Sequence, residues 1–152
     1  MLYMRPTSSE EIICFFSTKS QCKQGWIQHD ESCYHMSHDL EQWADAHYLC
    51  HLLGGYLAEV NTAEEGAFLD NQVKLFHFGE VWVGATDLVF EGEWVWSESQ
   101  SKLSEQHYTN WSPGEPNNAQ SNENCMAITN TGYWNDAPCS VLLHYLCEMP
   151  SG

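Results

Sequence analysis

Five oxygen-bearing side chains lie close together in the last third of the chain, and together they could bind a hard cation. Carboxylate and amide oxygens are the ligands that calcium prefers, whereas zinc and copper favour thiolates and imidazoles, which this set lacks. Turn-forming residues occupy 112–118, where a rigid loop could aim several side chains at one point. A polar surface loop with scattered charge is the alternative interpretation. The five residues are Glu115, Asn117, Glu123, Asn135 and Asp136.

Length, composition and charge limit the classes of protein to consider. The 152 residues suffice for one domain with a hydrophobic core. Hydrophobic residues make up 43% of the chain, which excludes general disorder. The formal net charge of −16 argues against a nucleic-acid or anionic-membrane partner, because both would be repelled. Nothing in the sequence predicts insertion into a membrane.

The cysteine content indicates where the protein works. Seven cysteines in 152 residues are typical of oxidising compartments, where disulfides persist. We therefore expect a secreted, extracellular protein. An odd number leaves one cysteine over, which suggests an interchain disulfide or an exposed thiol. Spacing alone does not fix which cysteines pair.

Two helices are expected in the first half of the chain. Apolar side chains recur at helical spacing over 39–53, and a Gly-Gly pair follows as a stop signal. Thr62 and Glu65 form a capping-box pattern at the start of a second helix, which should end before Gly79.

Short strands are expected at a hairpin over 26–34 and throughout the second half. They are rich in aromatic and β-branched residues and are separated by turn formers. Helices followed by small antiparallel strands favour an α+β fold over a parallel doubly wound sheet. The polar connection 97–121 is too long for an ordinary turn, and such loops are usually functional or disordered. The other expected strands are 81–85, 93–96, 125–129, 132–135 and 144–148.

Several motifs in one order resemble the C-type lectin family. Glu-Pro-Asn at 115–117, Glu123 two residues before a cysteine, and Trp-Asn-Asp at 134–136 before another resemble that family's calcium-dependent sugar site. The segment 82–85 resembles its central core strand. The likeness runs from about Cys22 to the last cysteine, which implies a lectin domain over 22–149 after an N-terminal extension over 1–21. It also implies two helices packed on small antiparallel sheets, with a long calcium-binding loop.

The resemblance implies three disulfides inside this domain. Cys14 is then left over, ahead of the domain, and we expect it to pair with a second subunit in a disulfide-linked dimer. A free buried thiol or a cap by a small thiol is the alternative. The implied pairs are Cys22 with Cys33, Cys50 with Cys147, and Cys125 with Cys139.

The resemblance also implies a mechanism for the five oxygen-bearing residues. All five would bind calcium, which keeps positions for two neighbouring hydroxyls of a sugar. Glu115, Asn117, Glu123 and Asn135 would bind the sugar as well, and Pro116 would be cis. Glu-Pro-Asn resembles the variant that takes mannose or N-acetylglucosamine, whereas Gln-Pro-Asp resembles the galactose variant. The partners expected are therefore glycans, in innate recognition of glycan-coated surfaces.

A second calcium position is a weaker expectation. The family's auxiliary site resembles Asp87, Glu91, Asn118 and Asn124, together with Glu123. Two of these are neutral amides where carboxylates are often found, which would lower affinity for the ion. The alternative places Asp87 and Glu91 exposed in a turn over 86–92.

Catalysis has no support in the sequence. No nucleophile elbow or phosphate-binding loop is present, and His47 and His51, although four residues apart, lack the glutamate of a metalloprotease motif. One packed and one solvated histidine is the simpler interpretation of that pair. A structural or protein-binding domain without sugar activity, associated with extracellular matrix or mineral, is the alternative function.

Overall fold

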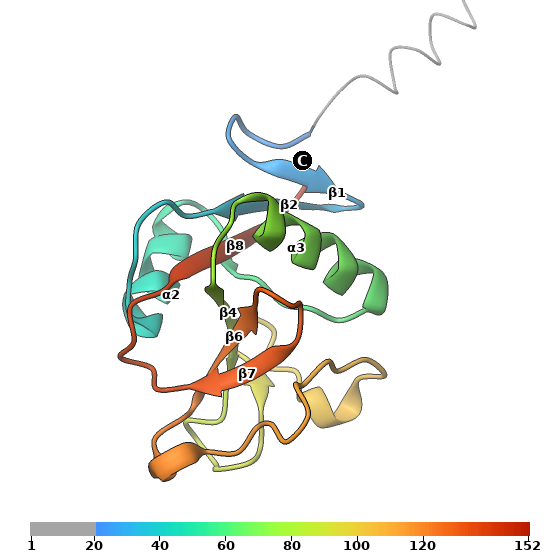
Figure 1. Ribbon diagram of the computed structural model, residues 1–152. Helices are drawn as coiled ribbons and strands as arrows, with labels where there is room; N and C mark the ends of the chain where they lie inside the picture. The colour runs from blue at the N-terminus through green and yellow to red at the C-terminus, as the bar shows by residue number, and fades with distance from the viewer. Residues whose placement is uncertain (1–20) are drawn as a thin grey trace, which may run out of the picture.

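The computed structural model describes residues 21–152, so Cys14 lies outside the described residues. Among those residues, no helix is long and apolar enough to span a lipid bilayer. Short 3₁₀ turns occur at Leu103–Glu105 and Ala119–Ser121. The helices and strands, in chain order, are β1 (Ile27–His29), β2 (Ser32–Met36), α2 (Trp43–Leu52), β3 (Tyr56–Leu57), α3 (Ala63–Leu75), β4 (Glu80–Thr86), β5 (Val95–Trp96), β6 (Cys125–Thr129), β7 (Trp134–Ala137) and β8 (His144–Pro150) (Figure 1).

The strands form one path in the order β1-β2-β8-β4-β6-β7, with β3 paired to β8 and β5 paired to β4. These pairs are antiparallel apart from β4 and β8, which run parallel. The expectation of purely antiparallel sheets is therefore wrong at this pair. Parallel neighbours need a long connection, and here the chain passes through the long loop, β6 and β7 between β4 and β8. The α+β class is confirmed, with a mixed sheet.

Helix α2 begins at Trp43, four residues after the predicted start at 39. The difference arises because Glu41 forms an antiparallel β-bridge with Leu143, which keeps the preceding backbone extended. The predicted stop is confirmed: Gly54 follows the helix with φ of +94°, a left-handed conformation that glycine adopts without steric cost.

Helix α3 has the cap that the sequence predicts. The Thr62 hydroxyl accepts a hydrogen bond from the Glu65 amide at 3.1 Å, which satisfies one of the free N–H groups of the first turn. The Glu65 carboxylate accepts in return from the Asn61 amide at 2.9 Å. The helix ends at Leu75, before Gly79 as expected.

Two hydrophobic clusters pack the helices against the sheet. Leu69 and Val73 of α3 join one cluster, and Ala46 and Cys50 of α2 join the other. Gly84 in β4 lies against β3, and a Cβ there would meet the Leu57 carbonyl oxygen at 2.7 Å. This close approach explains the glycine in the motif over 82–85.

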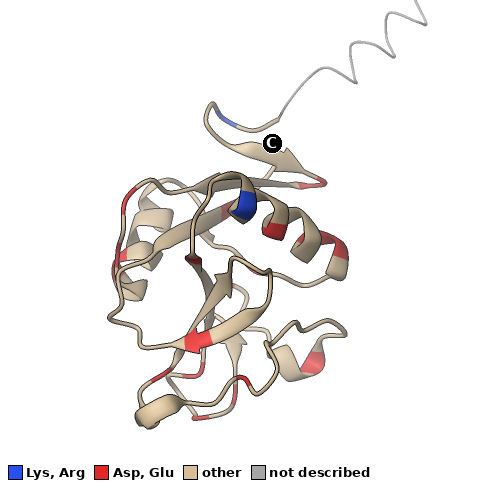
Figure 2. Ribbon diagram, viewed as in Figure 1, with Lys and Arg blue, Asp and Glu red and all other residues tan. Residues whose placement is uncertain are grey.

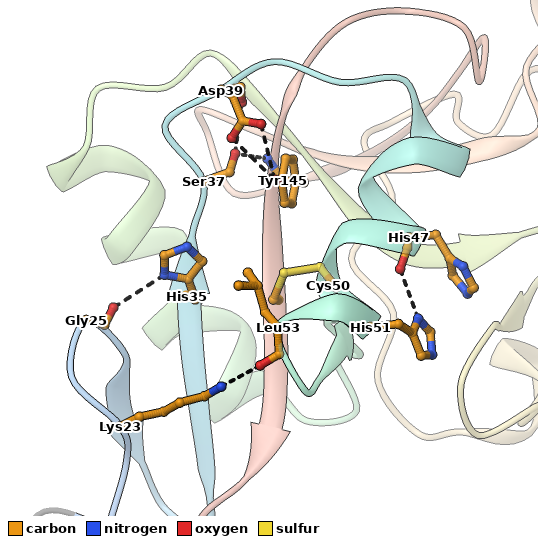
Figure 3. The surroundings of a disulfide bond; sticks show 11 residues. Lys23, Gly25, His35, Ser37, Asp39, His47, Cys50, His51, Leu53 and Tyr145 are labelled. Atoms are coloured by element: carbon orange, nitrogen blue, oxygen red, sulfur yellow. Dashed lines mark hydrogen bonds between the residues drawn. A yellow bond between two sulfur atoms is a disulfide. The ribbon is translucent and has the colours of Figure 1, made fainter.

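Three disulfides staple the fold, with the pairings that the resemblance implies. The Cys50–Cys147 bond joins α2 to β8 in the buried interior, and its surroundings are shown in Figure 3. It spans 97 residues of sequence, and a crosslink of that length stabilises the fold by about 4.7 kcal/mol in the chain-entropy model. The other two are Cys22–Cys33 and Cys125–Cys139.

Candidate functional site

The loop before residue 115 is attached to β7 by backbone hydrogen bonds. The Ser112 amide donates to the Trp134 carbonyl at 2.8 Å, and the Trp134 amide donates to the Asn110 carbonyl at 2.8 Å. The side-chain amide of Asn110 donates to the Gly132 carbonyl at 2.9 Å. These bonds carry the chain along β7, so the residues that follow arrive beside Asp136.

Aromatic rings fill the space beneath this loop. Trp134 is 1% exposed, and Trp111 and Tyr108 meet it edge-on at centroid distances of 5.9 Å and 5.6 Å. Aromatic pairs prefer such T-shaped contacts. Trp111 and Tyr108 therefore support the loop from below, whereas Tyr133 is 44% exposed.

Asp136 fixes the backbone of the Glu-Pro-Asn segment. The Glu115–Pro116 bond is cis, as the resemblance implies. The Asn117 amide donates to Asp136 Oδ1 at 3.3 Å, and the Asn118 amide donates to Asp136 Oδ2 at 2.7 Å. Asp136 is 1% exposed, so its charge is satisfied within the protein by backbone donors from this loop.

Three carboxylates converge at this point. Glu115, Glu123 and Asp136 each offer an oxygen, and the three oxygens lie within 4.8 Å of one another. Desolvation, followed by the hydrogen bond to Asp136 and its charge, raises the pKa of Glu115 to about 7. The carboxylates repel one another, and a dication bound among them would remove that repulsion. The oxygen-only donor set fits calcium.

The side-chain amides lie next to these carboxylates. Asn117 Nδ2 is 3.3 Å from Glu115 Oε2, and Asn117 Oδ1 accepts from the Ala119 amide at 3.1 Å. Asn135 is half-buried beside Asp136 on β7 and pairs with Ala127 of β6. The structure thus brings Glu115, Asn117, Glu123 and Asp136 together, with Asn135 adjacent.

Glu123 is held by the turn that follows the Glu-Pro-Asn segment. Its Oε1 accepts from the Ala119 amide at 3.0 Å, and its own amide donates to Asn118 Oδ1 at 3.0 Å. Asn118 adopts a left-handed conformation, with φ of 48°, which asparagine tolerates better than most residues. Asn118 therefore holds Asp136 through its backbone amide and Glu123 through its side chain.

Asp87, Glu91 and Asn124 form a second polar group. Asp87 is 2% exposed, so the alternative of two exposed turn residues does not hold for it. With the amide nitrogen of Asn124 facing the carboxylates, it donates to Asp87 Oδ1 at 2.9 Å and to Glu91 Oε1 at 3.1 Å. Asp87 Oδ2 accepts from the Gly92 amide at 2.8 Å. Asn124 thus joins the two carboxylates by hydrogen bonds.

Acidic residues also dominate the charge of this end of the molecule. Figure 2 shows acidic segments on β7 and along the neighbouring loops. The Lys–carboxylate pairs among residues 21–152 join Lys74 to Asp70 at 3.1 Å and Lys102 to Glu93 at 2.6 Å. Neither pair includes Glu115, Glu123 or Asp136.

The two helical histidines are accounted for by local packing. His47 stacks on Trp43 at 5.1 Å, and burial followed by the charge of His51 lowers the pKa of His47. His51 is exposed; its Nδ1 lies 2.9 Å from the His47 carbonyl (Figure 3) and its Nε2 lies 3.2 Å from Glu98 Oε1. One packed and one solvated histidine is the arrangement expected.

Known proteins resemble this chain in sequence and in overall structure. A family model described as the Lectin C-type domain matches residues 39–149. The chain is 35% identical to a C-type lectin mannose-binding isoform of Notechis scutatus scutatus, over 84% of this chain and 82% of that protein. The structure of this chain is similar to that of the C-type carbohydrate-recognition domain of cow CD23, solved in the presence of a GlcNAc2Man3 oligosaccharide. The TM-score is 0.80 at 34% identity, and the match covers 88% of this chain and 99% of that one.

A longer relative matches over one part of its length. The chain is 36% identical to the low affinity immunoglobulin epsilon Fc receptor of Mus musculus over 84% of its own residues, but these make up 37% of the receptor. The similarity therefore concerns a single domain of that receptor.

Proposed function

The chain belongs to the C-type lectin family of non-enzymatic binding domains, and on that premise we propose that it binds carbohydrate in a calcium-dependent manner. The observation that carries the proposal is the convergence of Glu115, Glu123 and Asp136 within 4.8 Å. Asn117 and Asn135 complete an oxygen donor set that suits calcium. We place the domain at 22–149 and the protein outside the cell, where its disulfides would persist.

The side chains of the site would recognise hydroxyl groups in complementary ways. Each sugar hydroxyl can donate to a carboxylate and accept from an amide, so Glu115 and Glu123 match the donors while Asn117 and Asn135 match the acceptors. Calcium, when bound, supplies open coordination positions for two neighbouring hydroxyl oxygens. The hydrogen bonds of Asp136 to the loop amides support the proposal, because they order the loop in advance.

We favour mannose or N-acetylglucosamine over galactose as the sugar. Glu115 and Asn117 place a carboxylate before an amide, in the order that resembles the mannose-type variant. The mannose-binding name of the Notechis relative supports this choice. Such a domain would serve in innate recognition of glycan-coated surfaces.

A glycan array with calcium, repeated with excess chelator, tests the proposal. We expect binding to mannose-type or N-acetylglucosamine-bearing glycans that disappears with chelator. Folded protein that takes up calcium but binds no glycan in either condition would favour the alternative, a structural or protein-binding domain. Glycan binding that persists with chelator would overturn the calcium mechanism.

Cys14 remains our candidate for an interchain disulfide. Individual lectin sites are weak, and a covalent dimer would gain avidity on a surface that presents many glycans. We expect the wild-type protein to run as a dimer on a non-reducing gel and Cys14→Ser to run as a monomer. A dimer band that survives the substitution would place the contact elsewhere.

A further inference from the structure

A second group of metal-ligating side chains shares no residue with the group in the long loop. The turn between β1 and β2 lies next to the first turn of α3 (Figure 1). His29, Asp30 and Glu64 each offer one ligand atom there, and these atoms lie within 4.8 Å of one another. From this geometry we propose that His29, Asp30 and Glu64 bind a transition-metal dication such as Zn²⁺.

The imidazole of His29 is held in place and has an unused nitrogen. Its ring stacks on Phe68 with centroids 4.2 Å apart and planes 12° from parallel. Nε2 is buried without a hydrogen-bond partner among the described residues. Buried polar atoms normally have partners, so an unpaired one needs an explanation. A metal ion at Nε2 would supply the missing interaction.

The distance from His29 to Asp30 leaves room for an ion. Nε2 and Asp30 Oδ2 are 3.8 Å apart, which is too long for a hydrogen bond. Zinc binds nitrogen and carboxylate oxygen at about 2.0–2.2 Å, so one ion can bridge ligand atoms up to about 4.2 Å apart. Glu64 is exposed on the first turn of α3, and its flexible side chain can close the remaining separation.

The donor types select the class of metal. Imidazole nitrogen suits zinc, copper and nickel, whereas calcium and magnesium prefer oxygen ligands. The carboxylates of Asp30 and Glu64 would neutralise the charge of a dication. The site also borders a hollow of about 640 Å³ that His29 and Asp30 help to line. A water molecule or another ligand could therefore occupy a fourth position, as in open zinc sites.

Calorimetric titration of the full chain with Zn²⁺, in the presence of saturating calcium, tests the proposal. Calcium occupies oxygen-only sites under this condition, so the remaining zinc binding reports sites that contain nitrogen or sulfur. Loss of the imidazole in His29→Ala should weaken zinc binding by about 10–100-fold or more, since even second-shell changes have effects of this size. Glu64→Gln, which leaves the stacked ring intact, should weaken it in the same direction.

The matched control is His51→Ala, because the rings of His47 and His51 also lie close together, with centroids 4.6 Å apart. This variant should bind zinc as the wild type does. Loss of zinc binding in His51→Ala with full binding in His29→Ala, or no zinc binding by the wild type, would overturn the proposal. Calcium-dependent glycan binding should be unchanged in His29→Ala, so this site and the lectin site can fail independently.

Discussion

Carboxylates at the two ends of the fold are used in different ways. Glu148 on β8 is 7% exposed, and each of its oxygens has a protein donor. Oε1 accepts from the Glu59 amide at 3.1 Å, and Oε2 accepts from the Ser32 hydroxyl at 2.8 Å. In the long loop, Glu115 and Glu123 instead converge with Asp136 on one point.

The two groups of carboxylates differ in whether their oxygens are available to a bound cation. The donors around Glu148 tie β8 to β2 and to the segment after β3, so its oxygens serve the fold as hydrogen-bond acceptors. The loop carboxylates also accept hydrogen bonds from backbone amides. Among residues 21–152, however, no lysine forms an ion pair with them that would offset their mutual repulsion. Burial of a carboxylate therefore does not by itself indicate a cation site; convergence does.

The largest effect should follow from removing the charge of Asp136. We expect Asp136→Asn to weaken calcium affinity by about 100-fold or more, because the residue is both a proposed ligand and the acceptor for two loop amides. Calorimetry with calcium, followed by mannose titration, measures this. Glu148→Gln is the matched control and should bind both normally. Sugar binding by Asp136→Asn at wild-type strength would contradict our assignment of the site.

Exchanging the carboxylate and amide should change which sugar binds. The double substitution Glu115→Gln with Asn117→Asp keeps the number of charges but reverses their order around Pro116. We expect the affinity ratio of mannose to galactose to shift toward galactose by about tenfold, or ~1.4 kcal/mol, the size of one hydrogen bond. Competition assays with both sugars give the ratio. An unchanged ratio at retained calcium affinity would show that other residues choose the sugar.

The pH dependence of stability should distinguish the structural carboxylate. Burial is the main cause that raises the pKa of Glu148 from its ordinary value of 4.5 to about 7. The folded state therefore holds this proton more tightly than the unfolded state. The contribution of Glu148 to stability is thus fully present below pH 4.5 and is lost as the pH rises to about 7. Glu148→Gln should remove that fall and be more stable by about 1–2 kcal/mol at pH 8.

Urea unfolding of wild type and Glu148→Gln at pH 5 and pH 8, both with chelator, measures the contribution of Glu148 to stability. The chelator keeps calcium binding out of the comparison, and the shared loop carboxylates cancel between the two proteins. Equal differences at the two pH values would show that Glu148 titrates alike in both states.

The smallest effect concerns the second polar group. With its amide nitrogen facing the carboxylates, Asn124 donates to both Asp87 and Glu91. Asn124→Asp adds a carboxylate, and we expect it to raise calcium affinity there by several-fold because affinity follows ligand charge. Calcium titration should then reveal a stronger second binding event. A single event of unchanged strength would argue against a calcium site at Asp87.

Local sequence signals are sufficient to predict where some helices begin or end. The Thr62 and Glu65 cap and the Gly54 stop involve residues a few positions apart, so their geometry follows from chain-local chemistry. Elements whose bounds depend on distant partners are predicted less accurately from the sequence. The sequence predicts a start of α2 four residues before Trp43, and it misses the bridge of Glu41 to Leu143, about a hundred positions away. The parallel pairing of β4 with β8 has no local signature either.

The features of the site likewise divide into those that the sequence predicts and those that depend on distant contacts. Its residue types and the order Glu-Pro-Asn, Glu and Asn-Asp are present in the sequence, and their oxygens predict the class of ion that they suit. Only the tertiary structure decided that Asn110 and Ser112 dock the loop on β7, that Asn118 serves as an anchor for Glu123, and that Asp136 is buried beneath the loop. Those contacts join residues 5 to 24 positions apart through backbone groups, which no residue type predicts.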